Sequence, residues 1–196
     1  MERKPKIIAA IQARLGSKRL PDKVLLELRG RSVVEHIVRR LKRARELDQV
    51  VIATSDSTKD DRLAEVAAKL GTNCVRGSEK DLVQRLLKTA DACDADAVVR
   101  ITGDSPLVDP ALVDRAVKDF RQRFGSIAFL SNCLPPSFPE GLNFEIIATD
   151  TLRHLDVNLT TPEDREAFII YLSSRPEKFL RHNVSYNRDA TDIRLT

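Results

Sequence analysis

Short apolar runs alternate with amphipathic stretches along the first two thirds of the chain. Three runs are rich in β-branched and small apolar residues and have the length of buried strands: 7–12, 50–53 and 97–102. In three further stretches apolar residues recur every three or four positions, as in helices that bury one face: 33–41, 63–70 and 81–92. This alternation predicts an α/β fold, a mostly parallel sheet with crossover helices.

Residues at the ends of the amphipathic stretches support the predicted helices. Ser32 is a plausible cap for the first helix, and Gly71 directly follows the second. Pro110 fits the first turn of a further helix, because its missing N–H would be unpaired there in any case. Asp109, one residue earlier, is expected to cap that helix.

The last third of the sequence is less regular. Residues 133–141 contain three prolines and a glycine, so they are expected to form a loop. Strands are expected at 144–148 and 180–184, and a helix at 162–174, whereas 74–75 form at most a short strand. Since no linker interrupts the chain, residues 1–196 are interpreted as a single domain.

Composition narrows the class of protein. The chain is 42% hydrophobic and 32% charged, and no apolar run approaches the roughly 20 residues that span a bilayer. The N-terminus lacks the long apolar region of a signal peptide, so we expect a cytoplasmic protein that does not associate with membranes. Cys74, Cys93 and Cys133 are far apart, which indicates free thiols rather than a disulfide or zinc site.

Charge is distributed unevenly. Residues 1–45 hold 14 lysines and arginines against 4 acidic residues, although the whole chain has a net charge of only +4. A basic region suits a polyanion, either a nucleic acid or a nucleoside triphosphate. Aromatic residues make up 5% of the chain and tryptophan is missing, which leaves few surfaces for base stacking and disfavours nucleic acid.

The basic loop that follows the first strand is the first candidate site. Gly16 and Ser17 can turn their amides toward a phosphate. Four side chains can neutralise a triphosphate: Arg14, Lys18, Arg19 and Lys23. The segment lacks the Walker pattern, so it is not a P-loop. Taken alone, it is equally compatible with a plain surface turn.

A second candidate site lies at the end of the strand 97–102. Gly103 and Asp104 follow this strand, which puts a carboxylate at the carboxyl edge of the predicted sheet. A hard cation that bridges phosphate oxygens favours an oxygen ligand of this kind. The alternative for Asp104 is an ordinary turn or cap residue.

Together these segments resemble a known family. The motifs IQARLGSKRLPDKV, VVIATSD, VRGSEKDLVQR and VVRITGDSPLVDP occur in this order over nearly the whole chain. They resemble the cytidylyltransferases, in particular the branch with the spore coat polysaccharide protein SpsF and the enzymes that activate KDO and neuraminic acid. The resemblance implies a three-layer, Rossmann-like nucleotidyltransferase fold similar to the GT-A architecture, and a homodimer.

The resemblance also implies a role for individual residues. Arg14, Lys23 and Asp104 would be catalytic, and Asp104 would hold Mg²⁺. The nucleotide would be bound by Gln12, Ala13, Arg14, Gly16, Ser17, Lys18, Arg19, Lys23, Arg76, Gly77 and Ser78. The acceptor sugar would be bound by Glu140, Gly141, Asn143 and Glu145. The implied reaction is attack of a sugar hydroxyl on the α-phosphate of CTP with release of pyrophosphate, in the biosynthesis of surface or spore coat polysaccharide.

The sequence departs from the family pattern at three places. Asn143 and Ala167 stand where relatives usually have aspartate and histidine. The sequence up to Thr196 does not include the family's C-terminal strand and helix, which usually supply a second metal-binding aspartate. Because Mg²⁺ relies strongly on phosphate oxygens and water, one carboxylate can suffice for binding. We therefore expect CTP binding with slow turnover.

Two other functions remain open on the sequence. The chain can be a catalytically impaired nucleotide-binding partner of another enzyme, which the three departures favour. It can also be a nucleotidyltransferase that uses another nucleoside triphosphate and a sugar 1-phosphate. The basic loop alone does not distinguish these alternatives from a cytidylyltransferase.

Overall fold

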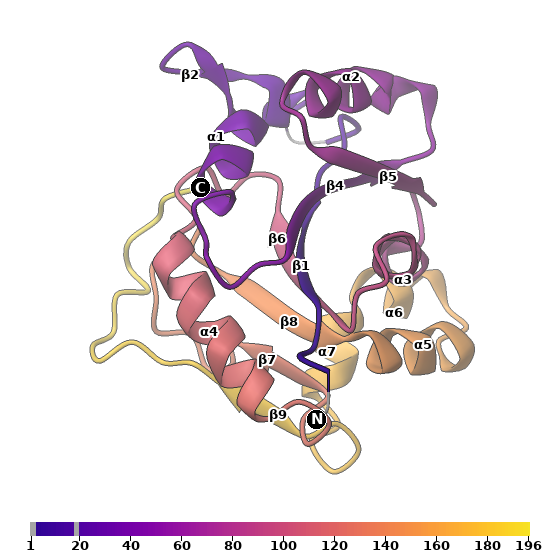
Figure 1. Ribbon diagram of the computed structural model, residues 1–196, viewed down its shortest axis with the longest axis vertical. Coiled ribbons are helices and arrows are strands. Elements are labelled where there is room, and N and C mark those ends of the chain that lie inside the picture. Colours follow the sequence, from indigo (N-terminus) through magenta and orange to yellow (C-terminus); the bar gives the residue numbers. More distant parts are fainter. Residues whose placement is uncertain (1–2, 18–19) are drawn as a thin grey trace.

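A seven-stranded sheet with helices on both faces forms the centre of the molecule (Figure 1). The structure, a computed structural model, describes residues 3–17 and 20–196, so Lys18 and Arg19 of the basic loop lie outside the described residues. The sheet consists of β1 (Ile7–Gln12), β4 (Gln49–Ser55), β5 (Asn73–Gly77), β6 (Ala97–Thr102), β7 (Phe129–Ser131), β8 (Phe144–Ala148) and β9 (Arg181–Asn183). A small hairpin is formed by β2 (Glu27–Leu28) and β3 (Arg31–Ser32). The helices are α1 (Val33–Leu41), α2 (Asp61–Lys69), α3 (Leu82–Ala92), α4 (Pro110–Gln122), α5 (Thr149–Asn158), α6 (Pro162–Glu166) and α7 (Phe168–Ser173), with 3₁₀ turns at Lys23–Leu25 and Thr58–Asp60.

The sheet is mostly parallel, as predicted. Its strand order is β5-β4-β1-β6-β8-β7-β9. Strands β5, β4, β1 and β6 are parallel neighbours, and β8 alone runs in the opposite direction, between β6 and β7. The carboxyl ends of β1 and β6 therefore lie side by side with the start of β8.

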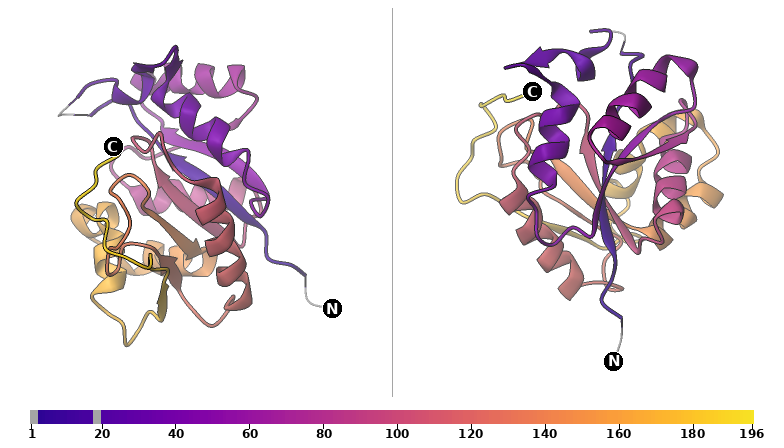
Figure 2. Two further views of the ribbon diagram at one scale, coloured as in Figure 1. Left: turned by 90° about the vertical axis from the view of Figure 1, so that its left-hand side faces the viewer. Right: turned by 45° about the horizontal axis from the view of Figure 1, so that its top comes forward.

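Both faces of the sheet are buried, which gives the three layers expected from the sequence. Helices α1, α2 and α4 pack with Ile7, Ala9 and Ile11 on one face. Helices α3, α5 and α7 pack with Ile8 and Ala10 on the other (Figure 2). Because successive side chains of a strand point to opposite faces, a strand covered on both sides is apolar throughout. This explains why β1 appears in the sequence as a continuous apolar run.

The predicted helix caps are confirmed. The Ser32 side chain accepts a hydrogen bond from the Glu35 amide at the start of α1. Asp109 accepts from the amide of Ala111, with Pro110 as the first residue of α4. These side chains satisfy backbone donors that have no partner inside their helices.

The C-terminal third differs from the prediction in several elements. The prediction of a single helix over 162–174 is wrong, because the helix is interrupted at Ala167 and divided into α6 and α7. Phe168 and Leu172 of α7 pack into the core, whereas α6 buries no residue and stays at the surface. The break lets the two segments take different directions. Strand β7 and helix α5 were not expected, and β9 is shorter than the predicted 180–184.

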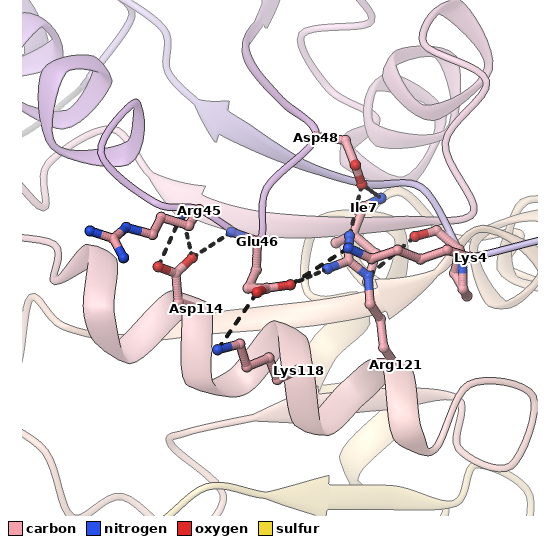
Figure 3. Close-up of polar contacts among 9 residues, drawn as sticks. Lys4, Ile7, Arg45, Glu46, Asp48, Asp114, Lys118 and Arg121 are labelled. Carbon is pink, nitrogen blue, oxygen red and sulfur yellow. Dashed lines mark hydrogen bonds and ion pairs between the residues drawn. The ribbon is translucent and has the colours of Figure 1, made fainter.

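A polar cluster ties the sheet to α4 at the amino end of β1, the edge away from Gln12 (Figure 3). Arg121 of α4 donates to Glu46 over 2.7 Å and to Asp48 over 2.9 Å. Asp48 also accepts from the amide of Ile7, the first residue of β1. Asp114, about two turns earlier on the same face of α4, accepts from the Arg45 and Glu46 amides. The cluster fixes the segment that enters β4.

Within residues 3–17 and 20–196, none of the helices has the length and apolar character needed to cross a membrane.

Candidate active site

A cleft of about 440 Å³ opens at the carboxyl ends of β1 and β6. It is lined by Gln12, Ala13, Arg14, Gly16, Ser17, Lys23, Val24, Glu79, Thr102, Gly103 and Asp104. Ligands of open α/β sheets bind at this edge, where loop amides and helix N-termini are directed outward. The structure thus brings the described residues of the basic loop and Asp104 into one cavity.

Gly103 allows the two loops of the cleft to lie against each other. Its amide donates to the Gln12 carbonyl over 2.9 Å. A Cβ at this position would lie 2.9 Å from the Ala13 Cβ and 2.9 Å from the Gln12 carbonyl oxygen. Because both neighbours are short and close to the backbone, neither can move aside easily. Only glycine keeps the β1 and β6 loops at this spacing.

A buried carboxylate, Asp60, holds the start of the basic loop in place. It accepts hydrogen bonds from the Leu15 amide over 2.7 Å and from the Ser55 amide over 3.2 Å, and also from the Ser55 hydroxyl. Asp60 is only 2% exposed. One side chain thereby joins the loop after β1 to the end of β4 and fixes the position of Arg14.

Replacing Asp60 by alanine is expected to lower the free energy of unfolding by about 2–4 kcal/mol, because buried donors lose their acceptor at about 1–3 kcal/mol each. Urea denaturation measures this change. Asp61→Ala is the matched control: that side chain is 54% exposed, and among the described residues its ion-pair partner is Arg76. An exposed ion pair contributes at most about 1 kcal/mol. Equal losses for the two variants would contradict the anchoring role of Asp60.

Arg14 forms ion pairs with two carboxylates, of which Glu79 also lines the cleft. Its Nη1 lies 3.3 Å from the Oε1 atom of Glu79, in the loop after β5, and its Nη2 lies 3.5 Å from Glu166 of α6. Beneath them lies the buried Arg85, which donates to the Ser78 carbonyl over 2.9 Å. Burial and the nearby Arg14 charge lower the pKa of Arg85. Arg14 therefore lies in a cluster of alternating charges.

Lys23 and Asp104 form an ion pair across the cleft. Burial by itself disfavours the charged carboxylate of Asp104. Hydrogen bonds from Lys23 and Thr102, together with the Lys23 charge, outweigh this and hold the pKa of Asp104 below its ordinary value. The carboxylate is therefore ionised at neutral pH, as a metal ligand must be.

Three of the predicted nucleotide-binding residues do not line this cleft. The Arg76 guanidinium is directed to the Ser55 and Ser57 carbonyls and to Asp61. Gly77 packs against the Arg85 backbone. The Ser78 amide donates to Gln84 at the start of α3. The next residue along the loop, Glu79, reaches the cleft instead.

A second cavity of about 410 Å³ adjoins the first one. It is lined by Arg100, Thr102, Asp104, Ser105, Cys133, Glu140, Gly141, Asn143, Glu145, Arg194 and Thr196. All four residues predicted to bind the acceptor are in this set. Thr102 and Asp104 line both cavities. The two predicted sites therefore meet at the carboxyl end of β6.

The end of the chain forms one wall of the second cavity. The Glu140 amide donates to the Ile193 carbonyl, and the Leu195 amide donates to the Glu140 carbonyl. Gly141 has φ +101°, and a Cβ there would lie 3.0 Å from the Leu195 carbonyl carbon. Glycine at this position is needed both for its backbone conformation and for the close approach of this segment.

Arg100 and Glu145 form the floor of the second cavity. They are directly opposite each other on β6 and β8, and Arg100 Nη1 donates to Glu145 Oε2 over 2.7 Å. Burial and the neighbouring Glu145 carboxylate raise the pKa of the Cys133 thiol to about 11. The thiol stays protonated at neutral pH and is not a nucleophile.

Several lining residues were missed in the sequence. Thr102 and Gly103 adjoin the predicted Asp104, and Glu79 adjoins the predicted Ser78. For Arg100 a signal was present, because it is the one charged residue in the apolar run 97–102. Arg194 and Thr196 carried no comparable signal, since irregular backbone brings them to the site.

Comparison with known proteins agrees with this geometry. The sequence profile described as cytidylyltransferase matches residues 8–187. The spore coat polysaccharide biosynthesis protein SpsF of Bacillus subtilis is 30% identical over 175 residues, which are 87% of this chain and 71% of that protein. A 3-deoxy-manno-octulosonate cytidylyltransferase of Trichlorobacter lovleyi is 34% identical over 116 residues, 58% of this chain and 44% of that protein. A solved cytidylyltransferase from Leptospira borgpetersenii superimposes with a TM-score of 0.94 at 36% identity, covering 98% of this chain and 81% of that one. The chain belongs to the cytidylyltransferase family of nucleotidyltransferases.

Proposed function

We propose that the protein transfers CMP from CTP to a sugar and releases pyrophosphate. The observation that carries this proposal is the pair of adjoining cavities that share Thr102 and Asp104. The first cavity is lined by the basic loop, whose amides and cationic side chains suit a triphosphate. The second cavity is lined by polar side chains that suit a sugar. The α-phosphate would lie where they meet, within reach of an acceptor hydroxyl.

The chemistry asks for positioning and charge neutralisation rather than a covalent intermediate. Arg14 and Lys23 would neutralise the phosphates, each by exchanging a protein carboxylate for a phosphate oxygen. The Gly16 and Ser17 amides would contact the phosphates, with Lys18 and Arg19 as further ligands. Gln12 and Ala13 would flank the nucleotide. The segment 76–78 does not line the cleft and would act on the nucleotide through the residue that follows it, Glu79.

The residues present fit a Mg²⁺ ion that is held mainly by substrate. Asp104 is ionised and lies where the cavities meet. Within residues 3–17 and 20–196, no three acidic, histidine or cysteine side chains form a metal cluster. Mg²⁺ commonly has one or two carboxylate ligands and takes the others from phosphates and water. When bound, the ion would neutralise charge that develops on the phosphate oxygens.

Calorimetric titration with the four nucleoside triphosphates, with and without Mg²⁺, tests the proposal. We expect CTP to bind more tightly than UTP, ATP or GTP, and Mg²⁺ to strengthen its binding. Release of pyrophosphate on addition of a sugar acid such as 3-deoxy-manno-octulosonate would then establish transfer. Equal binding of all four nucleotides, or no binding of CTP, would contradict the proposal.

A catalytically impaired nucleotide-binding partner is the second candidate. It is favoured by the small number of carboxylates in the first cavity: among the described residues that line it, Glu79 and Asp104 are the acidic ones. CTP binding without pyrophosphate release would support this candidate. For the active enzyme we propose a role in surface or spore coat polysaccharide biosynthesis, in line with the name of the SpsF relative. We also propose a homodimeric assembly, which rests on the family resemblance alone.

A further inference from the structure

Arg100 is a partly buried arginine that lines the second cavity. Its side chain is 17% exposed, and it projects from the middle of the sheet. Its Nε donates to the Gln12 side-chain oxygen over 2.8 Å, and its Nη1 donates to Glu145 over 2.7 Å. These partners come from β1 and β8, the strands on either side of β6. The guanidinium is therefore held in one orientation.

The Nη2 edge of Arg100 is available to a ligand. Within the described part of the chain, Nη2 makes no hydrogen bond or ion pair. It is also not among the fully buried polar atoms that lack a partner. Since Arg100 lines the cavity, this edge is accessible from it. A guanidinium presents its N–H donors as a planar fork that matches a carboxylate.

Two other arginines of similar burial show what such a group binds in this protein. Arg121, with a side chain 9% exposed, holds Glu46 through Nη1 and Asp48 through Nη2. Arg165, 14% exposed, holds Asp81 through Nε and Asp156 through Nη2. Each of the two binds two carboxylates from the protein. Arg100 binds a single one, Glu145, and faces a cavity with its second binding edge.

We propose that Arg100 is a specificity-determining residue that binds the carboxylate of an acidic acceptor sugar through Nη2. The inference rests on the proposed function and adds an acceptor-binding residue to it. Glu145 offsets the charge of the buried guanidinium and fixes its plane, so Glu145 orients Arg100 rather than contacting the acceptor carboxylate. Gln12 lines the first cavity, so its bond to Arg100 links the acceptor site to the nucleotide site.

The test measures sugar binding to protein saturated with Mg²⁺ and a CTP analogue whose α,β-bridge is a methylene group. The probes are 3-deoxy-manno-octulosonate and N-acetylneuraminate, each titrated as the acid and as its uncharged methyl ester. Wild-type protein should bind at least one acid more tightly than its ester. Arg100→Met should weaken binding of that acid by about 10- to 100-fold, the effect of losing a hydrogen bond to a charged group. Its affinity for the ester should change little, so the preference for the acid disappears.

Arg121→Met is the matched control, because it also removes a buried, ion-paired arginine but lies at the other end of the sheet. It should leave the affinities for the sugar and the nucleotide within twofold of wild type. Arg100→Lys, which keeps the charge without the fork, should recover part of the preference for the acid.

Three results would overturn the proposal: unchanged binding of the acid by Arg100→Met, an equal loss for acid and ester, or no binding of either acid by wild-type protein loaded with nucleotide. Loss of nucleotide affinity in Arg100→Met would place the residue in the nucleotide site and overturn it as well. Failure of wild-type protein to bind the CTP analogue would instead contradict the proposed function.

Discussion

Replacing Asp104 by asparagine is expected to abolish the Mg²⁺-dependent part of CTP affinity. It is also expected to slow CMP transfer by about 100- to 1,000-fold, which is the effect of removing one preorganised electrostatic group from a reaction centre. Asparagine keeps the size of the side chain but removes the charge that a hard cation needs. Asp104 lines both cavities, so the substitution affects the place where the two substrates are proposed to meet. Calorimetry with and without Mg²⁺, and an assay of pyrophosphate release, measure the two effects.

Asp109→Asn is the matched control for this substitution. It makes the same chemical change five residues further on, at the cap of α4, where asparagine is as good a cap as aspartate. Asp109 does not line the cleft, and its variant should bind CTP normally. Metal dependence that persists in Asp104→Asn would show that another group holds the ion.

The Asp104→Asn substitution is also expected to change stability at acid pH. The folded-state pKa of Asp104 lies below the ordinary value of 3.8. The ionised carboxylate therefore stabilises the fold above that value, and this contribution is lost as the pH falls through the lower folded-state pKa. Wild-type protein should lose slightly more stability than Asp104→Asn between about pH 5 and pH 2. Urea midpoints measured across this range give the comparison.

Lys23→Met is expected to weaken binding of CTP by about 10- to 100-fold, because a hydrogen bond to a charged group contributes about 1.5–3 kcal/mol. The substitution also removes the main partner of the Asp104 carboxylate. The pKa of Asp104 should then rise, and metal binding at mildly acidic pH should weaken. A CTP titration at pH 5.5 and at pH 8 separates these two effects.

Lys118→Met serves as the control for the lysine variant. Lys118 also pairs with a carboxylate, Glu46, but at the amino end of the sheet. The Lys118→Met variant should bind CTP as the wild-type protein does at both pH values. If Lys23→Met binds CTP normally, Lys23 orients Asp104 but does not contact the phosphates.

The strands at the centre of the sheet could be predicted almost residue by residue. β1, β6 and β8 have the expected bounds, because strands covered on both faces need apolar side chains at most positions. β7 could not be found, since three residues carry no periodicity and are stabilised only by their neighbours. The helix break at Ala167 depends on burial of Phe168, which is a tertiary contact.

The candidate site was predictable where its residues directly follow a strand. Arg14, after β1, and Asp104, after β6, reach the cleft as expected. Arg76 lies inside β5, and the side to which its guanidinium turns is decided by the Ser55 and Ser57 carbonyls. Sequence order does not show such contacts between neighbouring strands. Arg100 was missed for the same reason, because its position opposite Glu145 depends on the register of β6 and β8.

Because β8 runs in the reversed direction, its start lies beside the carboxyl end of β6, and the two proposed substrate sites are completed by different strands. The first cavity is built by β1, the β5 loop and β6, whereas β8 and the end of the chain complete the second, with β6 common to both. If the proposed sites are correct, substitutions around β8 would alter which sugar is accepted and leave the strands around the proposed nucleotide site unchanged. Such a division would let acceptor preference diversify within the family on an unchanged nucleotide-binding scaffold.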